Sequence, residues 1–331
     1  LLTEGEENML ALVCRHFKKS VVLLNVGNII DMQWVMRYNP GAVAYIWQGG
    51  QEGCRGVLDV LNGTVNPCGK LPDTIACTPA DYPAADHYGA DDRNIYAEDI
   101  YVGYRYFETF APEKVLYPFG FGLSYTKFEV RLLSADETAD GITAFAAVQN
   151  TGSCPGKEVV QLYVADCTGT TGRPPKELRK FVKVKLEPGE EKQVEFTLTA
   201  QDLSYYDETL GSWYAAPGEY KILLGHSSRD IHATLSVRFS TPRRRPFVID
   251  ENTTIGELSK DDRTAAIIQQ VLAQAGNALT GGNAGGSEIA SSEAVAQMLD
   301  SMPLRGIVNF GGPAAAGMIT PLLEILRAAI Q

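Results

Sequence analysis

Hydrophobic positions in the first part of the chain form apolar runs and helical repeats. Apolar residues recur three and four positions apart between residues 9 and 17, which predicts an amphipathic helix. The apolar run at 21–26 then predicts a buried parallel strand. The pattern repeats, with a helix predicted over 29–39, a second buried strand over 42–47 and a further helix over 49–63. This alternation of strands and helices predicts an α/β domain with parallel strands.

The pattern changes near Lys127, where short runs of alternating apolar and polar residues begin. Turn residues separate seven such runs, which read "FEVRLL", "ITAFAAVQN", "EVVQLYVAD", "RKFVKVKLEP", "KQVEFTLTA", "GEYKILLG" and "HATLSVRF". Seven short strands within roughly a hundred residues predict an antiparallel β-sandwich of the immunoglobulin or fibronectin type III kind. No Cys–Trp–Cys arrangement supports a true immunoglobulin domain.

The last part of the chain is rich in alanine and is predicted to be helical. We interpret the arginine run between Pro242 and Pro246 as a solvated linker. Beyond this linker, the sequence predicts helices over 262–276, 292–302 and 318–330, with a flexible glycine-rich joint over 277–288.

Length and charge narrow the classes of function. The chain has 331 residues, which suits two or three domains. Its formal net charge is −11, and an acidic surface repels phosphate, so no nucleic-acid partner is expected. No apolar run is long enough to span a bilayer, so no membrane partner is expected either.

The six cysteines show no CxxC spacing, which argues against a zinc ribbon or a redox motif. We favour free thiols in a reducing compartment, which predicts a cytoplasmic protein. The chain begins at Leu1 in what is predicted to be the first turn of a helix, so we expect the true N-terminus to be absent. The lack of a signal peptide is therefore uninformative, and secretion stays open.

No self-contained catalytic motif, such as GxSxG or HExxH, occurs in the sequence. None of the four histidines has ligand spacing to another histidine or to a cysteine, so no metal site is predicted. Carboxylates cluster at Glu4, Glu6 and Glu7, where Thr3 and Glu6 predict a capping box and the helix dipole favours negative charge. Glu98 lies in a polar stretch that either lines a cleft or forms a solvated loop.

The stretch "WQGGQEG" is the strongest candidate for a binding site. Trp47 ends a predicted buried strand, and Gln48 to Gly53 form the turn into the next helix. Ligands of open α/β sheets bind at the carboxyl ends of the strands. Trp47 offers a face that can stack on a sugar, and Gln48 and Glu52 offer hydrogen-bonding groups. The alternative is that Trp47 belongs to the core and that the glycines only permit tight packing.

Four stretches, in order, resemble glycoside hydrolase family 3, the β-glucosidase and β-xylosidase group. They read "VVLLNVGNIIDMQW", "AYIWQGGQEGCRGVLDVLNGTVNPCGKLPDTIA", "EDIYVGYRYFETF" and "VLYPFGFGLSYTKF". The segment "NPCGKLPDT" is similar to the family's N-P-S-G-K-L-P pattern, with Cys68 where serine is common. The tail, with "IDENTTIGEL" and "MPLRGIVNFGG", resembles the C-terminal extension of some bacterial members.

The resemblance implies three regions. Residues 1–126 are expected to form the C-terminal portion of a flavodoxin-like parallel α/β sandwich domain. Residues 127–241 are expected to form a fibronectin type III-like β-sandwich, and residues 242–331 a linker and an α-helical extension. The segment 115–128 resembles the passage between the first two regions, where aromatic side chains would wedge the domains together and glycines would let the backbone turn.

The family implies a retaining, exo-acting β-glycosidase of the β-glucosidase type. Its nucleophilic aspartate lies on a TIM-like barrel and its acid/base glutamate on a loop of the α/β domain, and both are expected upstream of Leu1. The chain alone is therefore predicted to be inactive, with Trp47, Gln48 and Glu52 as a wall of the sugar pocket and the barrel as its missing partner. A β-glucoside or related oligosaccharide is the expected substrate, no metal or organic cofactor is implied, and a homo-oligomer is compatible with the sequence.

Two other hypotheses stay open at this point. The chain could be a non-catalytic carbohydrate-binding or interaction protein whose working part is the sandwich, with the aromatic residues Tyr205, Tyr206, Trp213 and Tyr214. It could also be one chain of a split enzyme whose barrel is a separate chain.

Overall fold

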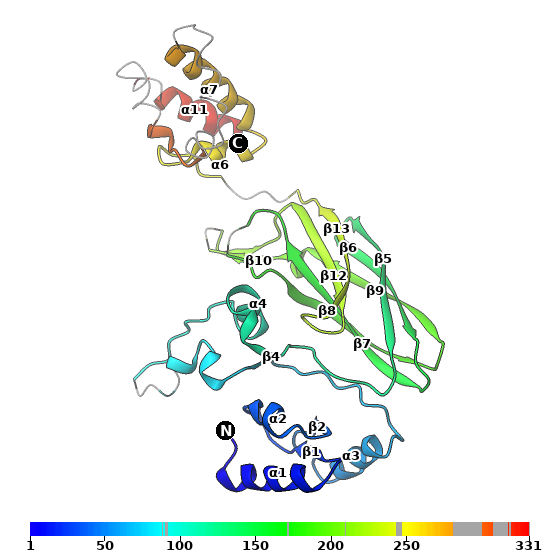
Figure 1. The fold of residues 1–331 in the computed structure, drawn as a ribbon. Coiled ribbons are helices and arrows are strands. Elements are labelled where there is room, and N and C mark those ends of the chain that lie inside the picture. The colour runs from blue at the N-terminus through cyan, green and yellow to red at the C-terminus, as the bar shows by residue number, and fades with distance from the viewer. Residues whose placement is uncertain are drawn as a thin grey trace. The chain divides into compact units, whose positions relative to one another are not determined.

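The structure is a computed structural model that describes residues 1–87, 89, 92–170, 172–208, 210–242, 247–280, 300–306, 317 and 319–330. It divides into two compact units, Leu1–Arg243 and Arg244–Gln331, which are described separately (Figure 1). The predicted linker at 243–246, residues 281–288 of the predicted joint and most of the predicted helix over 292–302 lie outside the described residues. None of the described helices is long and apolar enough to cross a membrane.

The first part of unit 1 has the predicted alternation of helices and parallel strands (Figure 1). Its elements are α1 (Glu4–His16), β1 (Val21–Leu24), α2 (Gln33–Tyr38), β2 (Ala42–Tyr45) and α3 (Gly53–Leu61). β1 and β2 pair in parallel, so their carboxyl ends lie at the same edge of the sheet. Thr3 caps α1 as predicted, because its hydroxyl accepts from the Glu6 amide at 3.3 Å and its amide donates to the Glu6 carboxylate at 2.8 Å.

The helix predicted over 29–39 begins only at Gln33, because one tertiary and one local hydrogen bond hold the preceding backbone in a loop. The amide of Ile30 donates to the hydroxyl of Tyr45 at 3.1 Å. The amide of Gln33 donates to the carboxylate of Asp31 at 3.2 Å. The amides of the first helical turn have no carbonyl partner within the helix. The Asp31 carboxylate satisfies one of them by accepting from Gln33.

Short elements between residues 75 and 117 complete the α/β part. They are β3 (Ile75–Ala76), α4 (Tyr104–Phe110), β4 (Val115–Tyr117) and the 3-10 turns Pro79–Asp81, Ala85–His87 and Pro112–Lys114. β3 and β4 pair antiparallel. Phe107 of α4 is fully buried against Ala76 and Ala111, and Tyr104 of the same helix is also buried, so two aromatic side chains anchor α4.

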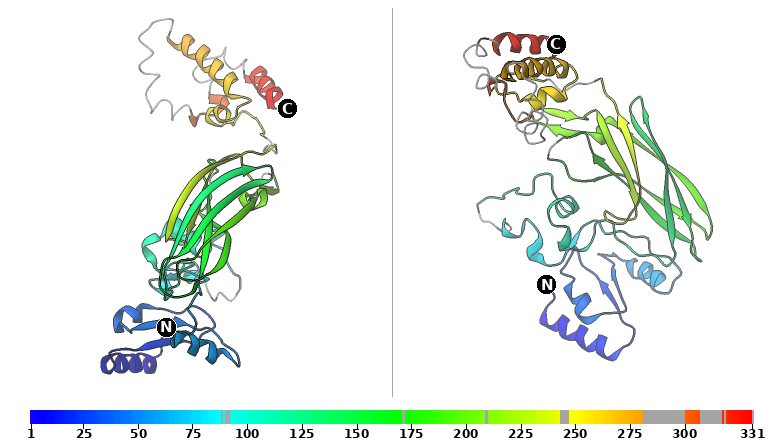
Figure 2. Two further views of the ribbon diagram at one scale, coloured as in Figure 1. Left: turned by 90° about the vertical axis from the view of Figure 1, so that its right-hand side faces the viewer. Right: turned by 45° about the horizontal axis from the view of Figure 1, so that its top comes forward.

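Seven strands form the two facing sheets of a sandwich, and all seven strand predictions are confirmed (Figure 2). They are β5 (Phe128–Thr138), β6 (Gly141–Asn150), β7 (Gly156–Asp166), β8 (Glu177–Leu186), β9 (Glu191–Thr199), β12 (Gly218–Gly225) and β13 (Ile231–Phe239). One sheet has the order β13-β12-β7-β8 and the other the order β5-β6-β9. The sequence did not predict the short helix α5 (Ala200–Leu203) or the hairpin of β10 (Tyr205–Asp207) and β11 (Ser212–Tyr214).

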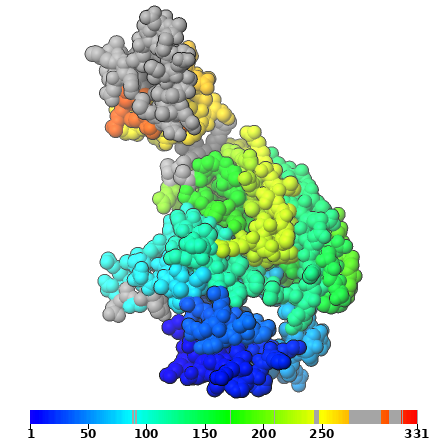
Figure 3. Space-filling model, in the orientation of Figure 1, coloured from blue at the N-terminus to red at the C-terminus, as the bar shows by residue number. Residues whose placement is uncertain are grey.

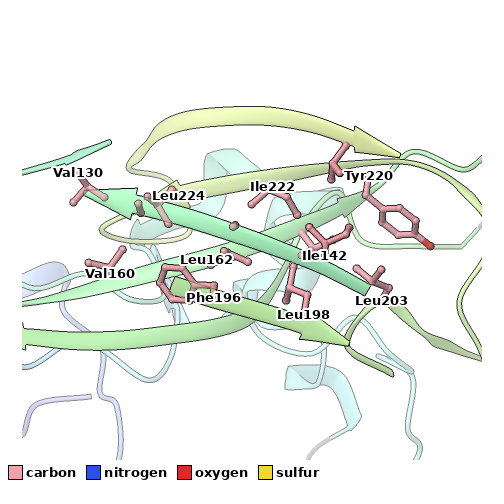
Figure 4. Close-up of a cluster of buried hydrophobic side chains, with 14 of the residues drawn as sticks. Val130, Ile142, Val160, Leu162, Phe196, Leu198, Leu203, Tyr220, Ile222 and Leu224 are labelled. Atoms are coloured by element: carbon pink, nitrogen blue, oxygen red, sulfur yellow. The ribbon is translucent and has the colours of Figure 1, made fainter. Parts of the chain in front are cut away.

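The inner faces of the two sheets share one hydrophobic core. Leu162 of β7 and Leu224 of β12 are fully buried, as are Ile142 of β6 and Leu198 of β9 in the other sheet (Figure 4). Burying one such side chain contributes about 1.5–3 kcal/mol. The alternation that predicted these strands therefore reflects a core to which both sheets contribute.

The aromatic and glycine-rich segment 115–128 joins the α/β part to the sandwich. The ring of Phe119 stacks on that of Tyr104 with centroids 4.7 Å apart, and the Phe119 carbonyl accepts from the Ser228 amide at 2.9 Å. Gly120 has a φ of 81°, and its carbonyl accepts from the Gln161 side chain at 3.2 Å. The ring of Phe119 thus packs on the α/β part, whereas its backbone and that of Gly120 bond to the sandwich, and in Figure 3 the α/β residues (blue to cyan) and the sandwich (green to yellow) form a continuous surface.

Unit 2 is helical, with α6 (Ile255–Lys260), α7 (Ala265–Thr280), the 3-10 turn Leu304–Gly306 and α11 (Ile319–Ile330). α7 and α11 confirm the helices predicted over 262–276 and 318–330. α7 continues to Thr280, through residues that were predicted to be part of a flexible joint. α6 was not predicted, even though Thr254 and Glu257 form a capping box at its start. The hydrophobic core of unit 2 is centred on the buried side chains of Leu258, Ile268 and Leu326.

Candidate functional site

The candidate site is the loop between β2 and α3, residues 46–52. The amide of Ile46 donates to the Leu24 carbonyl at 3.1 Å, which extends the parallel pairing by one residue before the loop leaves the sheet. The loop therefore starts at the carboxyl edge of both strands, the position at which ligands of open α/β sheets bind. The sequence predicted this placement.

Trp47 lies half-buried at the start of this loop. Its φ is 51°, a left-handed conformation that costs a non-glycine residue about 1–3 kcal/mol. Its ring lies 5.1 Å from that of Tyr45, whose hydroxyl is itself fixed by the Ile30 amide. Burial raises the pKa of Tyr45, so this hydroxyl stays neutral and keeps its proton as a donor. Trp47 is thus held against a fixed neighbour while part of its surface stays open.

Gln48 reaches back across the loop that follows β1. A Cβ atom on Gly27 would lie 3.2 Å from the Gln48 amide nitrogen, so the glycine leaves the room that this side chain occupies. Gln48 also lines an open pocket of about 610 Å³ beside β1 and α3. The residues around the pocket are mainly apolar or glycine, and they are Leu23, Asn25, Ile46, Gln48, Gly49, Gly50, Gly53, Cys54, Val57, Leu58 and Leu61.

Asn25 is a pocket residue that the sequence analysis missed. The apolar run at 21–26 was predicted to be one strand, which placed Asn25 inside it, whereas β1 ends at Leu24. Asn25 is therefore the first residue after the strand, at the same edge as Gln48. Its polar side chain within an apolar run was the signal that could have shortened the predicted strand.

Glu52 does not join the other two predicted residues at the pocket. It occupies the N-cap position of α3 without a side-chain capping bond, and it pairs with Arg55 at 3.1 Å. The side chain of Glu52 is 74% exposed and that of Arg55 is 83% exposed. The structure thus separates the predicted set: Gln48 lines the pocket, Trp47 packs on Tyr45, and Glu52 faces solvent.

The pocket beside the loop is lined by no described carboxylate that could serve as a catalytic acid. A general acid needs a carboxyl group with a raised pKa. Several carboxyl groups in the described part instead have a lowered pKa, and these include Glu6, Asp81, Glu158, Glu190, Asp202 and Asp250. Among the described residues that line the pocket, none is an aspartate or a glutamate.

The carboxylates at the start of α1 have structural roles, as predicted. Hydrogen bonds from the amide and hydroxyl of Thr3 lower the pKa of Glu6. Glu7 pairs with Arg37 of α2 at 3.2 Å. Glu98 is half-buried in a turn segment before α4, and it does not line the pocket.

Comparison with known proteins gives the same domain order. The family model "Glycosyl hydrolase family 3 C-terminal domain" matches residues 1–125, and the "Fibronectin type III-like domain" matches residues 158–228. Thermostable beta-glucosidase B of Acetivibrio thermocellus is 37% identical over 334 residues, covering 98% of this chain and 42% of that protein. A beta-glucosidase of Ruminococcus albus is 46% identical over 235 residues, covering 69% of this chain and 25% of that protein.

Solved structures of family-3 β-glucosidases also match this chain. The GH3 beta-glucosidase of Bifidobacterium adolescentis matches 80% of this chain and 39% of its own, with a TM-score of 0.74 and 33% identity. An α/β domain followed by a fibronectin type III-like sandwich defines the class, a multidomain glycoside hydrolase module. The chain belongs to glycoside hydrolase family 3. It spans about a quarter to two fifths of the length of the first curated relatives it matches.

Proposed function

We propose that the chain is the C-terminal portion of a retaining, exo-acting β-glucosidase. The observation that carries the proposal is the match to the A. thermocellus beta-glucosidase along 98% of the chain, from the α/β part to the helical unit. The proposed substrate is a terminal β-linked glucoside or a related oligosaccharide. The six free cysteines support a reducing, cytoplasmic compartment as part of the same proposal.

In this proposal the reacting carboxylates are supplied by other parts of a longer family-3 protein. Retention requires a nucleophile and an acid/base residue about 5 Å apart. The described pocket residues include no carboxylate, and carboxyl groups elsewhere in the described chain, such as Glu158 and Asp202, are stabilised in the charged form. A TIM-like barrel and the acid/base loop would complete the site, and no metal or organic cofactor is required.

The exposed apolar surface of the α/β part supports a longer protein. Leu23, Leu58 and Leu61 line the pocket and are 38%, 59% and 44% exposed. Met9 and Leu12 of α1 are 56% and 58% exposed. An apolar surface of this kind is stabilised when it is buried. We assign its cover to the remainder of the family-3 α/β domain.

The loop 46–52 would then form one wall of the sugar subsite. The half-buried ring of Trp47 can stack on a pyranose face, and the amide of Gln48 can bind sugar hydroxyls. Glu52 would lie at the solvent-exposed edge of this subsite, because its carboxylate already pairs with Arg55.

The test is hydrolysis of nitrophenyl β-glucoside and β-xyloside by the purified chain, with and without a family-3 barrel that extends through the acid/base loop. We expect background rates for the chain alone and activity on addition of the barrel. Hydrolysis by the chain alone would overturn the assignment of the reacting carboxylates. Inactivity in both samples would favour a binding module.

A second candidate function rests on the β10–β11 hairpin of the sandwich. Tyr206 and Trp213 form a cross-strand pair with ring centroids 5.9 Å apart, and they are 54% and 56% exposed. Exposed aromatic rings of this kind bind the faces of sugars. Retention of the chain on an insoluble β-glucan column, lost in Trp213→Ala, would support this function, and equal elution of both proteins would exclude it.

A further inference from the structure

Two histidines and an aspartate meet at the turn between β12 and β13, far along the sequence from the sugar loop. His226 and Asp230 lie in the turn, and His232 is the second residue of β13. The rings of His226 and His232 lie 4.7 Å apart at 77°. The metal-ligating atoms of the three residues all lie within 4.8 Å of one another.

We propose that these three side chains bind a divalent transition-metal ion of the zinc class. Two imidazoles and one carboxylate form a donor set that suits Zn²⁺ and leaves one tetrahedral position for water. The Nε2 atom of His232 lies 3.0 Å from Oδ1 of Asp230. Donor atoms of a tetrahedral zinc site lie roughly 3.3–3.6 Å apart, given Zn–N and Zn–O bonds of about 2.0–2.2 Å. This pair is therefore already close to a bound geometry.

Glu158 of β7 orients the third ligand. Nδ1 of His226 lies 2.8 Å from the Glu158 carboxylate, and a carboxylate only accepts, so Nδ1 carries the proton. The lone pair of His226 is then on Nε2, the nitrogen available to a metal. A carboxylate behind a ligating histidine is the usual outer partner of a zinc site. Glu158 is fixed in turn by Lys70 at 3.0 Å, and its side chain is only 5% exposed.

The backbone of the turn is held in place without a metal. The His226 amide donates to the Asp230 carbonyl at 2.9 Å, and the Asp230 amide donates to the Ser227 hydroxyl at 2.9 Å. Arg229 anchors the turn to Glu108 of α4 at 2.8 Å. The side chains of His232 and Asp230 are 41% and 60% exposed, so they can close on an ion by rotation alone. His226 and His232 have five residues between them across this turn, which lies within the spacing of three to five residues found between histidine ligands of zinc, so the sequence prediction that no such pair exists was wrong.

The test is calorimetric titration of the purified chain with Zn²⁺, before and after its thiols are alkylated. We expect one ion per chain in both cases, because no cysteine belongs to the cluster. His232→Ala should weaken binding by more than about 100-fold, since loss of an outer partner alone costs about 10- to 100-fold. Asp230→Asn should also weaken it, and both residues are exposed enough for the variants to fold.

Two further variants separate this site from general histidine binding and from a structural role of Glu158. His16→Ala should leave the affinity unchanged, because among the described residues His16 belongs to no such cluster. Glu158→Gln should weaken Zn²⁺ binding about 10-fold while zinc still raises the melting temperature of the folded variant. Absence of stoichiometric binding, equal affinity in His232→Ala, or loss of binding on alkylation would each overturn the proposal. The inference does not depend on glycosidase activity.

Discussion

The β-sandwich and the α/β part of unit 1 differ in how completely they bury their own apolar side chains. In the sandwich, Leu162, Ile222 and Leu224 are fully buried between two sheets. In the α/β part, α3 has no buried residue and α1 buries only Leu10. The sandwich is therefore stabilised mainly by its own contacts. The helices of the α/β part would be stabilised by the proposed remainder of the family-3 chain.

The sharpest test compares one leucine from each region. Leu162→Ala should lower the free energy of unfolding by about 3 kcal/mol, because it leaves a cavity in a closed core. Leu58→Ala should change it by no more than about 0.5 kcal/mol, because this side chain is 59% exposed. Urea unfolding of the purified chain, followed by circular dichroism, measures both values.

The same pair in a full family-3 protein sharpens the comparison. If the rest of the α/β domain covers α3, Leu58→Ala should now cost about 2 kcal/mol or more. Leu162→Ala should cost the same as in the isolated chain. An unchanged, small effect of Leu58→Ala in the longer protein would contradict the proposed cover.

The segment that joins the two regions should be sensitive to a single methyl group. A Cβ on Gly122 would overlap the backbone carbonyl of Gly69, so Gly122→Ala should destabilise the chain by about 2 kcal/mol. Gly5 in α1 has open space around its Cβ position, and Gly5→Ala should stabilise the chain by up to about 1 kcal/mol. Thermal unfolding measures both effects. Equal melting temperatures of the two variants would show that the backbone around Gly122 moves readily to accommodate a methyl group.

The sugar loop can be tested in a full-length family-3 protein. Gln48→Leu should lower kcat/KM for a nitrophenyl β-glucoside about 10-fold, the effect of about 1.4 kcal/mol of lost hydrogen bonding. Gln51→Leu is the matched control, because Gln51 is exposed in the same loop and does not line the pocket. Equal values for the two variants would remove Gln48 from the proposed wall.

Much of this fold could be predicted because local patterns determine it. The seven sandwich strands alternate apolar and polar residues over 8 to 11 positions, and each was found. The hairpin β10–β11 was missed because strands of three residues are too short to show a period. The start of α2 was misplaced because a tertiary contact, Tyr45 to the Ile30 amide, holds the preceding loop.

The sites depend more on such long-range contacts. The position of Trp47 and Gln48 after a parallel strand was predictable, since strand ends are local features. The exposure of Glu52 follows from its pairing with Arg55 at the first turn of α3, and an i,i+3 pair could have been noticed. The spacing of His226 and His232 could have indicated the metal cluster, but its outer partner Glu158 lies 68 residues away in sequence and is brought close only by the fold.

A further comparison of the two regions uses two similar helix caps. Asp202 in the sandwich and Asp81 in the α/β part each close a capping box with a threonine and pair with a lysine. Burial opposes the charged form of Asp202, but hydrogen bonds from Lys180 and Thr199 outweigh it, so its pKa is lowered. A hydrogen bond from Thr78 lowers the pKa of Asp81.

A lowered folded-state pKa stabilises the protein above the unfolded pKa of about 3.9, and this contribution is lost as the pH falls through the folded value. Wild type should therefore exceed Asp202→Asn in stability by about 1 kcal/mol at neutral pH, and the difference should vanish in acid. Asp81→Asn should show the same sign with a smaller effect in the isolated chain, because the surrounding α/β part is less well packed. Melting temperatures from pH 7 to pH 3 provide the measurement. An advantage of wild type that grows in acid would reverse the assigned direction, and a larger loss in Asp81→Asn would show that the α/β part is the better stabilised region.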